Sequence, residues 1–144
     1  MSTIVVGLDG SPESKAALRW ALAEARLRNA TLHVVHAWVI PAVFGVDAAF
    51  VLAEAIEGFQ EEAGRVLDEA LAEVAGEAGT DVPLEREVVQ GPASACLLRA
   101  AAGADLLVVG SRGHGGFAGL LLGSVSQQCA HHATCPVVIV RGQA

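Results

Sequence analysis

The sequence has no long apolar run, no lysine after Lys15 and no acidic residue after Asp105. Glycine, proline or charge breaks every apolar stretch before it reaches the roughly 18 residues of a membrane-spanning helix, so no membrane span is expected. The N-terminus has no basic region and no small-residue cleavage site, which argues against a signal peptide and predicts a cytoplasmic location. The three cysteines predict reduced core thiols rather than a disulfide framework.

Charge is distributed unevenly along the 144 residues, whose formal net charge is −7. Residues 47–90 contain twelve acidic and two basic residues, a balance that should repel nucleic acid. After Asp105 the charged residues are Arg112 and Arg141, accompanied by three histidines, so this part suits a small anion. Hydrophobic residues make up 53% of the chain, which excludes disorder and, with the length, predicts one domain over residues 1–144.

Segments with strand character alternate with segments of helical periodicity. Short β-branched or apolar runs predict strands, and a 3.6-residue apolar period predicts helices. The predicted strands are Thr3–Leu8, Thr31–Ala37, Leu84–Val89, Asp105–Val109 and Pro136–Arg141, and the predicted helices are 11–29, 47–77, 91–103 and 124–133. The first third of 47–77 is less regular, which leaves a loop or a separate turn open there. Such alternation predicts a parallel sheet with helices on both faces.

A glycine-rich segment, Gly110–Ser124, joins a predicted strand to a predicted helix. Glycine lets backbone N–H groups approach an anion, and a helix N-terminus adds the positive end of its dipole. Gly123 and Ser124 offer a close approach and a hydroxyl at the helix start, while Gly110 and Gly113 predict a tight turn off the strand. A plainer interpretation stays open, in which the glycines only shape a loop and Ser124 only caps the helix.

Two familiar phosphate motifs do not fit this segment. A Walker loop requires a lysine after its second glycine, and no lysine follows Lys15. A dinucleotide fingerprint would begin at Gly113 and requires an acid about 20 residues further on. No acid follows Asp105, which disfavours this motif as well.

Six residues are candidate zinc ligands: His33, His36, Cys129, His131, His132 and Cys135. Most of the C-terminal ligands would lie on one short helix without a second cluster, whereas structural zinc needs four ligands arranged tetrahedrally. His33 and His36 are expected on opposite faces of one strand. Packed thiols and helix-end histidines near the negative end of the dipole are therefore the preferred interpretation.

The spacing Gly110-x2-Gly113-x9-Gly123-Ser124 resembles the nucleotide-binding signature of the universal stress protein family, in its ATP-binding branch. The opening 4–11 and the closing 135–140 resemble the same family, so the likeness covers the whole chain. The family fold is a three-layer α/β sandwich, Rossmann-like and related to the adenine nucleotide alpha hydrolases. It has a five-stranded parallel sheet of order 3-2-1-4-5 with helices on both faces.

That order has two consequences for this sequence. It places the most charged strand, Leu84–Val89, at a sheet edge, as its composition also suggests. It reverses direction between the first and fourth strands, and ligands in open α/β sheets bind at such a switch point. Asp9 and Gly110, about a hundred residues apart, should therefore meet in space.

The resemblance implies ATP or ADP as the ligand, with Mg²⁺ as a candidate companion. The residues it implicates are Asp9, Ala37, Gly110, Gly113, Gly123, Ser124 and Val125. The main chain from Gly110 to Val125 would hold the phosphates with the Ser124 hydroxyl, Asp9 would lie on the ribose or metal side, and Ala37 would meet adenine through main-chain atoms.

Plainer roles stay open for three of the residues around this site. Asp9 could serve only as a turn former that hydrogen-bonds the backbone ahead of a Ser11 cap. Arg112 and His114, in the glycine-rich segment, could neutralise phosphate or be solvated surface residues.

The last predicted strand is apolar on both faces over Val137–Val140, and the family order makes it a sheet edge. Exposed apolar edges need covering, and the resemblance implies antiparallel pairing with the same strand of a second subunit. The expected function is a homodimeric, ATP-binding stress or regulatory protein.

Two other functions remain open. One is a slow ATPase or adenylate-handling hydrolase that uses Asp9 and a divalent metal. The other is a nucleotide-free dimer module for protein partners, which the full glycine signature disfavours. No Gly-x-Ser-x-Gly elbow or base poised to activate water is apparent, so slow or absent ATP hydrolysis is expected.

Overall fold

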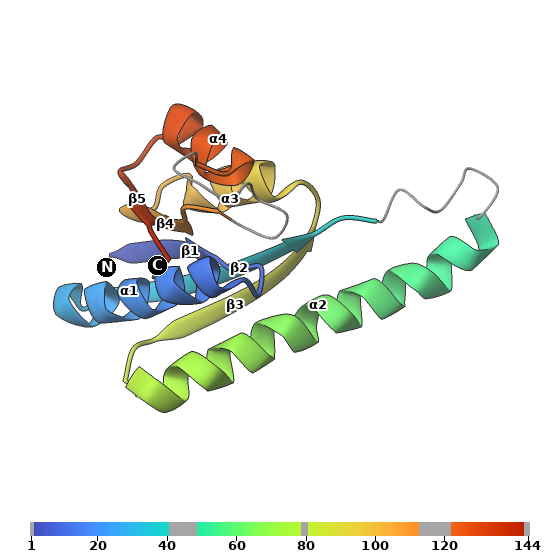
Figure 1. The fold of residues 1–144 in the computed structure, drawn as a ribbon, viewed down its shortest axis with the longest axis horizontal. Helices are drawn as coiled ribbons and strands as arrows, with labels where there is room; N and C mark the ends of the chain where they lie inside the picture. The colour runs from blue at the N-terminus through green and yellow to red at the C-terminus, as the bar shows by residue number, and fades with distance from the viewer. Residues whose placement is uncertain (1, 41–48, 79–80, 113–121, 143–144) are drawn as a thin grey trace.

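The computed structural model describes residues 2–40, 49–78, 81–112 and 122–142. Within them, strands and helices alternate from one end to the other (Figure 1). The elements are β1 (Thr3–Gly7), α1 (Pro12–Arg28), β2 (Thr31–Trp38), α2 (Ala49–Ala78), β3 (Leu84–Gln90), α3 (Ala93–Ala101), β4 (Leu106–Gly110), α4 (Ser124–His132) and β5 (Val137–Val140). The predicted alternation is confirmed, with boundaries displaced by a few residues at most of the ends.

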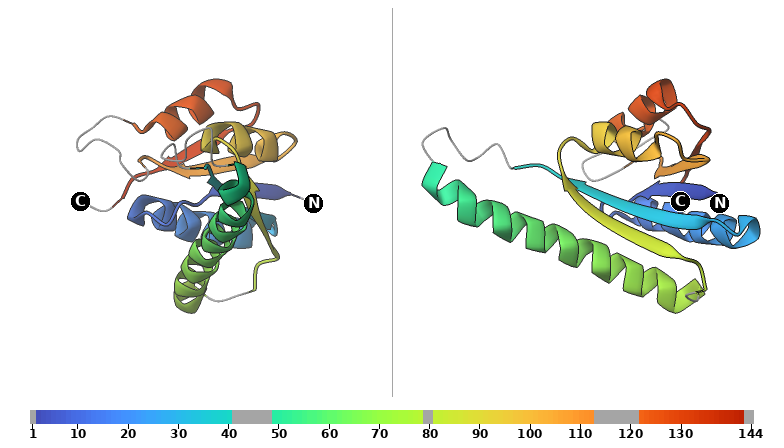
Figure 2. Two further views of the ribbon diagram at one scale, coloured as in Figure 1. Left: turned by 90° about the vertical axis from the view of Figure 1, so that its right-hand side faces the viewer. Right: turned by 180° about the vertical axis from the view of Figure 1, so that it is seen from behind.

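The expectation of an irregular first third in the second helical region is wrong. Helix α2 runs without a break from Ala49 to Ala78. Residues 49–57 contain mostly alanine, leucine and glutamate and no glycine or proline, and these residue types favour a continuous helix. Figures 1 and 2 show that this N-terminal part of α2 extends beyond the end of the sheet.

The strands form one sheet in the order β3-β2-β1-β4-β5, and every neighbouring pair is parallel. The central strand β1 has β2 on one side and β4 on the other, so that Val6 lies opposite both Val34 and Val108. The chain leaves β1 toward β2 and β3, then returns to the other side of β1 for β4 and β5. The predicted order is confirmed, and with it the charged strand β3 at an edge.

The sheet separates two hydrophobic cores, one under α1 and α2 and one under α3 and α4 (Figures 1 and 2). Side chains of β1 alternate between them: Ile4 and Val6 join the α1/α2 core, and Val5 joins the α3/α4 core. Strands buried on both faces must be apolar at successive positions. The short aliphatic runs in the sequence therefore reflect this three-layer arrangement.

The α3/α4 core also contains Cys129, which is 0% exposed. Burial raises the pKa of this thiol to about 11, so it is protonated at neutral pH. Cys96 is buried, Cys135 is partly buried, and all three cysteines are free thiols. That these thiols stay reduced remains a prediction.

Helix α1 begins and ends as its sequence predicts. The Ser11 hydroxyl accepts a hydrogen bond from the Ser14 N–H at 3.2 Å, and Pro12 occupies the first turn. Asn29 closes the helix in the left-handed conformation, with φ of 53°, which asparagine tolerates better than most residues. The cap at Ser11 fixes the end of the loop between β1 and α1, where Asp9 lies.

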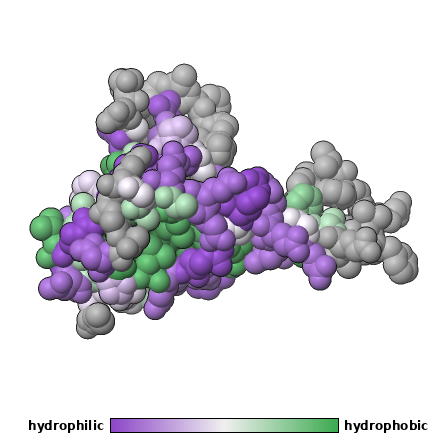
Figure 3. Space-filling view, turned by 90° about the horizontal axis from the view of Figure 1, so that it is seen from below, coloured by the Kyte–Doolittle hydropathy of each residue, from purple (hydrophilic) through white to green (hydrophobic). Residues whose placement is uncertain are grey.

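The face seen in Figure 3 is largely hydrophilic, with a hydrophobic patch near the middle of the view. Ion pairs join α2 to α1 and to β3. Lys15 pairs with Glu73 at 2.8 Å and Arg86 with Asp68 at 2.9 Å. Such exposed pairs contribute about 0–1 kcal/mol each, so they affect the charge of the surface more than the stability of the fold.

In the described parts of the chain, no helix has the length and apolar character needed to cross a membrane.

Gly110 is the last residue of β4, and α1 packs closely against it. The turn predicted for Gly110 and Gly113 stays a prediction, because Gly113 lies outside the described residues. A Cβ atom at Gly110 would lie 2.9 Å from the main-chain carbonyl carbon of Glu13, closer than real Cβ atoms come. The glycine therefore permits the contact between the start of α1 and the end of β4.

Gly110→Ala should lower the free energy of unfolding by about 1–3 kcal/mol, because backbone must shift to admit the methyl group. Gly58→Ala is the matched control, since an added Cβ there meets nothing within 4 Å on an exposed helix face. It should raise stability by about 0.5–1 kcal/mol. Urea unfolding of both variants checks this; equal stability of the two would contradict the packing argument.

Candidate functional site

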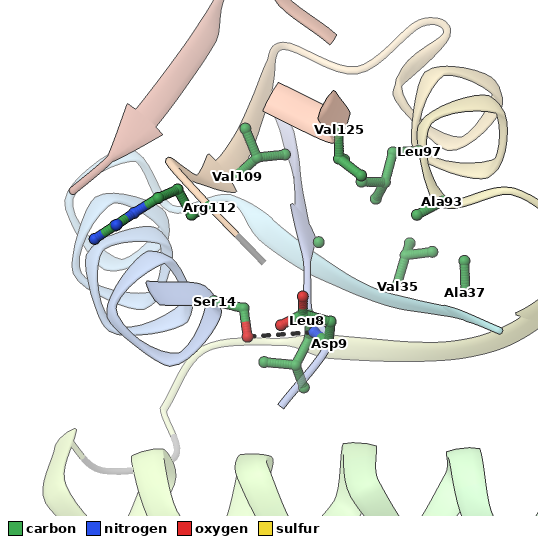
Figure 4. A pocket seen from close by; sticks show the side chains of 12 residues that line it. Leu8, Asp9, Ser14, Val35, Ala37, Ala93, Leu97, Val109, Arg112 and Val125 are labelled. Atoms are coloured by element: carbon green, nitrogen blue, oxygen red, sulfur yellow. Dashed lines mark hydrogen bonds between the residues drawn. The ribbon is translucent and has the colours of Figure 1, made fainter. Parts of the chain in front are cut away.

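A pocket opens where β1 and β4 end side by side, at the reversal of strand order. Its walls come from both sides of the sheet, from the end of β2 and from three helices (Figure 4). Four of the predicted site residues line it: Asp9, Ala37, Gly110 and Val125. The structure thus brings together residues from three strand ends and α4, as the switch-point argument predicts.

One end of the pocket is apolar. Val35, Ala37, Ala93 and Leu97 lie there together, the first two from β2 and the others from α3 (Figure 4). Sequence reasoning missed Ala93 and Leu97, because small and aliphatic residues on a helix look the same whether they line a pocket or fill a core. This end suits a flat, weakly polar group.

Ala37 also lies beyond the point at which the pairing of β2 with β1 ends. The paired register of β1 and β2 stops at Gly7 and Val35, and a last hydrogen bond runs from the Leu8 N–H to the Val35 carbonyl at 2.9 Å. In a parallel ladder, alternate residues direct both main-chain groups toward the same neighbour. The N–H and C=O of Ala37 thus point toward the β1 side of the strand, beyond the last residue of β1 that is paired with β2.

Asp9 occupies the opposite wall and is tied into the start of α1. Its Oδ1 accepts the N–H of Ser11 at 2.9 Å, and its own N–H donates to the Ser14 hydroxyl at 3.2 Å. The Ser14 hydroxyl in turn donates to the Ser11 carbonyl at 2.9 Å. The turn-forming interpretation of Asp9 is therefore confirmed, while a ligand-binding role stays a prediction. Ser14, a buried hydroxyl in the pocket wall, was missed at the sequence level.

The start of α4 is fastened to the end of β4. The Gly123 N–H donates to the Ser111 carbonyl at 2.7 Å, and the Ser126 hydroxyl donates to the same carbonyl at 3.0 Å. Gly123 is the cap and Ser124 is the first helical residue, so the interpretation of Ser124 as the cap is wrong. The first N–H groups of a helix have no intrahelical acceptor, and this turn borders the pocket through Val125.

Arg112 lines the same pocket, at the end opposite Ala37 (Figure 4). Its Nη2 lies 3.7 Å from Oε1 of Glu13, and its side chain is 32% exposed. Arg112 is thus a wall residue rather than a distant surface cation. Gly113 and His114, the other residues predicted in this segment, lie outside the described residues.

The pocket lining thus combines groups of different chemistry. It has an apolar part around Ala37 and Leu97, with Val125 of α4 beside Leu97, and it has the carboxylate of Asp9 and the hydroxyl of Ser14. Arg112 lies on the side opposite Ala37, with its guanidinium directed toward α1. A flat heterocycle, a sugar and an anionic group match these surroundings.

These features define a doubly wound α/β protein with a crevice at its switch point. The sequence matches the profile of the universal stress protein family over residues 1–141. The chain therefore belongs to the universal stress protein family, which confirms the resemblance found in its motifs.

Curated relatives are universal stress proteins as well. A universal stress protein of Mycolicibacterium smegmatis is 41% identical over 145 residues, covering 96% of this chain and 45% of the relative. One from Thermus aquaticus is 40% identical over 143 residues, covering 96% of this chain and 98% of the relative. The chain thus spans about half the length of the mycobacterial relatives and nearly all of the Thermus protein.

Solved structures agree on the fold. Universal stress protein UspA from Lactobacillus plantarum superposes with a TM-score of 0.82 at 23% identity, over 97% of each chain. A universal stress protein solved in complex with cAMP has a TM-score of 0.67 at 33% identity, over 96% of this chain and 95% of that one. The family member from Archaeoglobus fulgidus solved in complex with dAMP has a TM-score of 0.67 at 22% identity, over 97% and 98%.

The turn at Asp9 generates a stability prediction. Asp9→Ala removes the acceptor of the Ser11 N–H and should cost about 1–2 kcal/mol of unfolding free energy. Asp9→Asn keeps an oxygen at the same place and should stay within about 0.5 kcal/mol of the wild type. Chemical denaturation of both variants checks this. If asparagine were as destabilising as alanine, the charge rather than the hydrogen bond would matter.

Proposed function

We propose that this chain binds an adenine nucleotide, ATP or ADP, in the switch-point pocket and acts as a nucleotide-dependent stress or regulatory factor. The observation that carries the proposal is the combination, in the lining of one pocket, of an apolar part at Ala37, the carboxylate of Asp9 and the start of α4 at Val125. The relative at 33% identity that was solved with cAMP supports an adenine nucleotide as the ligand class.

In the proposed complex the base lies against Ala93 and Leu97, with its polar edge toward the main chain of Ala37. The ribose lies near Asp9. Among the described residues that line the pocket, Asp9 is the acidic one. The phosphates meet the main chain at Gly110, Gly113, Gly123, Ser124 and Val125, with the Ser124 hydroxyl and the Arg112 guanidinium as further donors.

Mg²⁺ is a further part of the proposal, bound chiefly through the phosphates. Magnesium typically takes one or two carboxylates and keeps several waters, so Asp9 alone could serve as its protein ligand. Among the described residues no three histidine, cysteine or acidic side chains cluster as a metal site. A magnesium ion would thus arrive with the nucleotide rather than occupy a site of its own.

We infer binding rather than efficient catalysis. The carboxylate oxygen Oδ1 of Asp9 is already engaged with the Ser11 N–H, which makes it a poor base for activating water. The competing ATPase function predicts steady phosphate release that Asp9→Ala abolishes while nucleotide binding is retained. Release well below one per minute would favour the regulatory role.

Strand β5 supports a second part of the proposal, a homodimer through Val137–Val140. The strand lies at the sheet edge, is paired with β4, and each of its residues is partly exposed. The carbonyl groups of Pro136 and Val140 accept hydrogen bonds from the N–H groups of Leu107 and Ser111. Because main-chain groups alternate in direction along a strand, the N–H of Ile139 points away from β4. An antiparallel copy of β5 would cover this apolar edge.

Calorimetric titration tests the nucleotide proposal directly. The wild type should bind ATP or ADP, and Ala37→Leu, whose side chain enters the apolar end, should weaken binding at least about tenfold. Ala23→Leu, the same change on the exposed face of α1, should leave binding unchanged. Wild-type protein that gives no heat with either nucleotide would remove the central claim and favour the nucleotide-free dimer module.

Sedimentation tests the dimer. Ile139→Pro deletes the outward N–H without removing a donor from the β4–β5 pairing, so the variant should sediment as a folded monomer while the wild type sediments as a dimer. Leu84→Pro makes the equivalent change at the β3 edge and should remain a dimer. A wild-type monomer, or a dimer of the Ile139 variant, would contradict pairing through β5.

A further inference from the structure

His36 is a buried polar side chain, 8% exposed, that the proposed nucleotide site does not use. It lies on β2 immediately before Ala37, so its side chain points to the opposite face of the sheet. Its Nδ1 is 2.7 Å from the carbonyl oxygen of Leu8. A carbonyl can only accept, so Nδ1 carries the proton and donates it to this bond.

The Leu8 carbonyl belongs to the residue at which the β1–β2 ladder ends. The Leu8 N–H still follows the ladder and bonds to Val35 at 2.9 Å. One further step of parallel pairing would direct the N–H of Ala37 to the carbonyl of Leu8. The imidazole of His36 is the donor that meets this carbonyl instead, and the paired register stops at Gly7 and Val35.

The same peptide group is held at its other end. The peptide that joins Leu8 to Asp9 is planar, so its C=O and N–H point in opposite directions. Its carbonyl accepts from His36 at 2.7 Å, and its N–H donates to the Ser14 hydroxyl at 3.2 Å. The two side chains therefore fix the orientation of this plane from opposite sides.

We propose that His36 is a positioning residue for nucleobase recognition. By holding the Leu8 carbonyl, it keeps the β1–β2 ladder from closing over Ala37 and directs the Ala37 amide to the base instead. This inference rests on the proposed adenine-nucleotide function. In this role His36 would act from the opposite face of the sheet, without contacting the ligand itself.

His33 offers a comparison on the same strand. Its Nε2 lies 2.9 Å from Oε1 of Glu87, and its side chain is 19% exposed. It points to the other face and lies outside the lining of the pocket. Replacing His33 removes a partly buried histidine and one polar contact without altering the end of β1.

The experiment compares His36→Leu, His36→Asn and His33→Leu with the wild type. Leucine removes the donor, whereas the side-chain amide of asparagine places an N–H close to where Nδ1 stood. Each folded variant is titrated with ADP and, separately, with inorganic pyrophosphate, which has no base. Thermal unfolding is recorded alongside, so that a loss of affinity is separated from a loss of structure.

The proposal predicts that His36→Leu binds ADP about tenfold more weakly while its pyrophosphate affinity stays within about twofold of the wild type. His36→Asn should recover most of the ADP affinity, and His33→Leu should bind ADP normally. Wild-type ADP affinity in folded His36→Leu, or a parallel loss for pyrophosphate, would overturn it. If the leucine variant does not fold, a tenfold loss in folded His36→Asn overturns it, and near-normal affinity supports it. Wild-type protein that binds no ADP would instead refute the proposed function.

Discussion

Strand β1 must be buried on both faces and flanked on both edges. Ile4, Val5 and Val6 are each 0% exposed, which requires helices above and below and strands on either side. The chain satisfies this requirement by crossing to β2 first and returning to β4 later. The helices that follow β1 and β4 consequently lie on opposite faces of the sheet, and the space between the two strand ends becomes the pocket. The site is therefore a consequence of how the central strand is covered.

The turn after β1 combines structural and functional demands in a few residues. Its main-chain and side-chain groups are joined by short hydrogen bonds that involve His36, Asp9 and the two serines at the start of α1. Such a network fixes the wall of the pocket before any ligand arrives, which reduces the cost of ordering on binding. It also lets the Asp9 carboxylate stabilise the turn while Asp9 lines the pocket.

Much of this architecture could be predicted from the sequence. Aliphatic runs such as Ile4–Val6 predicted the buried strands, and the charges at Glu85 and Glu87 predicted the exposed edge strand. The motif spacing that ends at Gly123 identified the family. These features can be recognised in the sequence because burial on two faces, exposure at an edge and glycine at fixed intervals each require particular residue types at particular positions.

Other features left no such pattern. Leu97 lines the pocket with the same side chain that would fill a core, and the position of Ala37 depends on where its neighbour β1 ends. The close packing of α1 against Gly110, a contact between segments distant in sequence, was also not predicted. Such properties arise from tertiary contacts, which residue types alone do not specify.

The most direct test of the account is a map of backbone amide shifts in isotopically labelled protein as ADP is added. The account predicts the largest changes at the ends of β1, β2 and β4 and in the first turn of α4, with Ala37 and Val125 among them. No change at saturating ADP, or changes confined to α2 and β3, would contradict the placement of a nucleotide in the switch-point pocket.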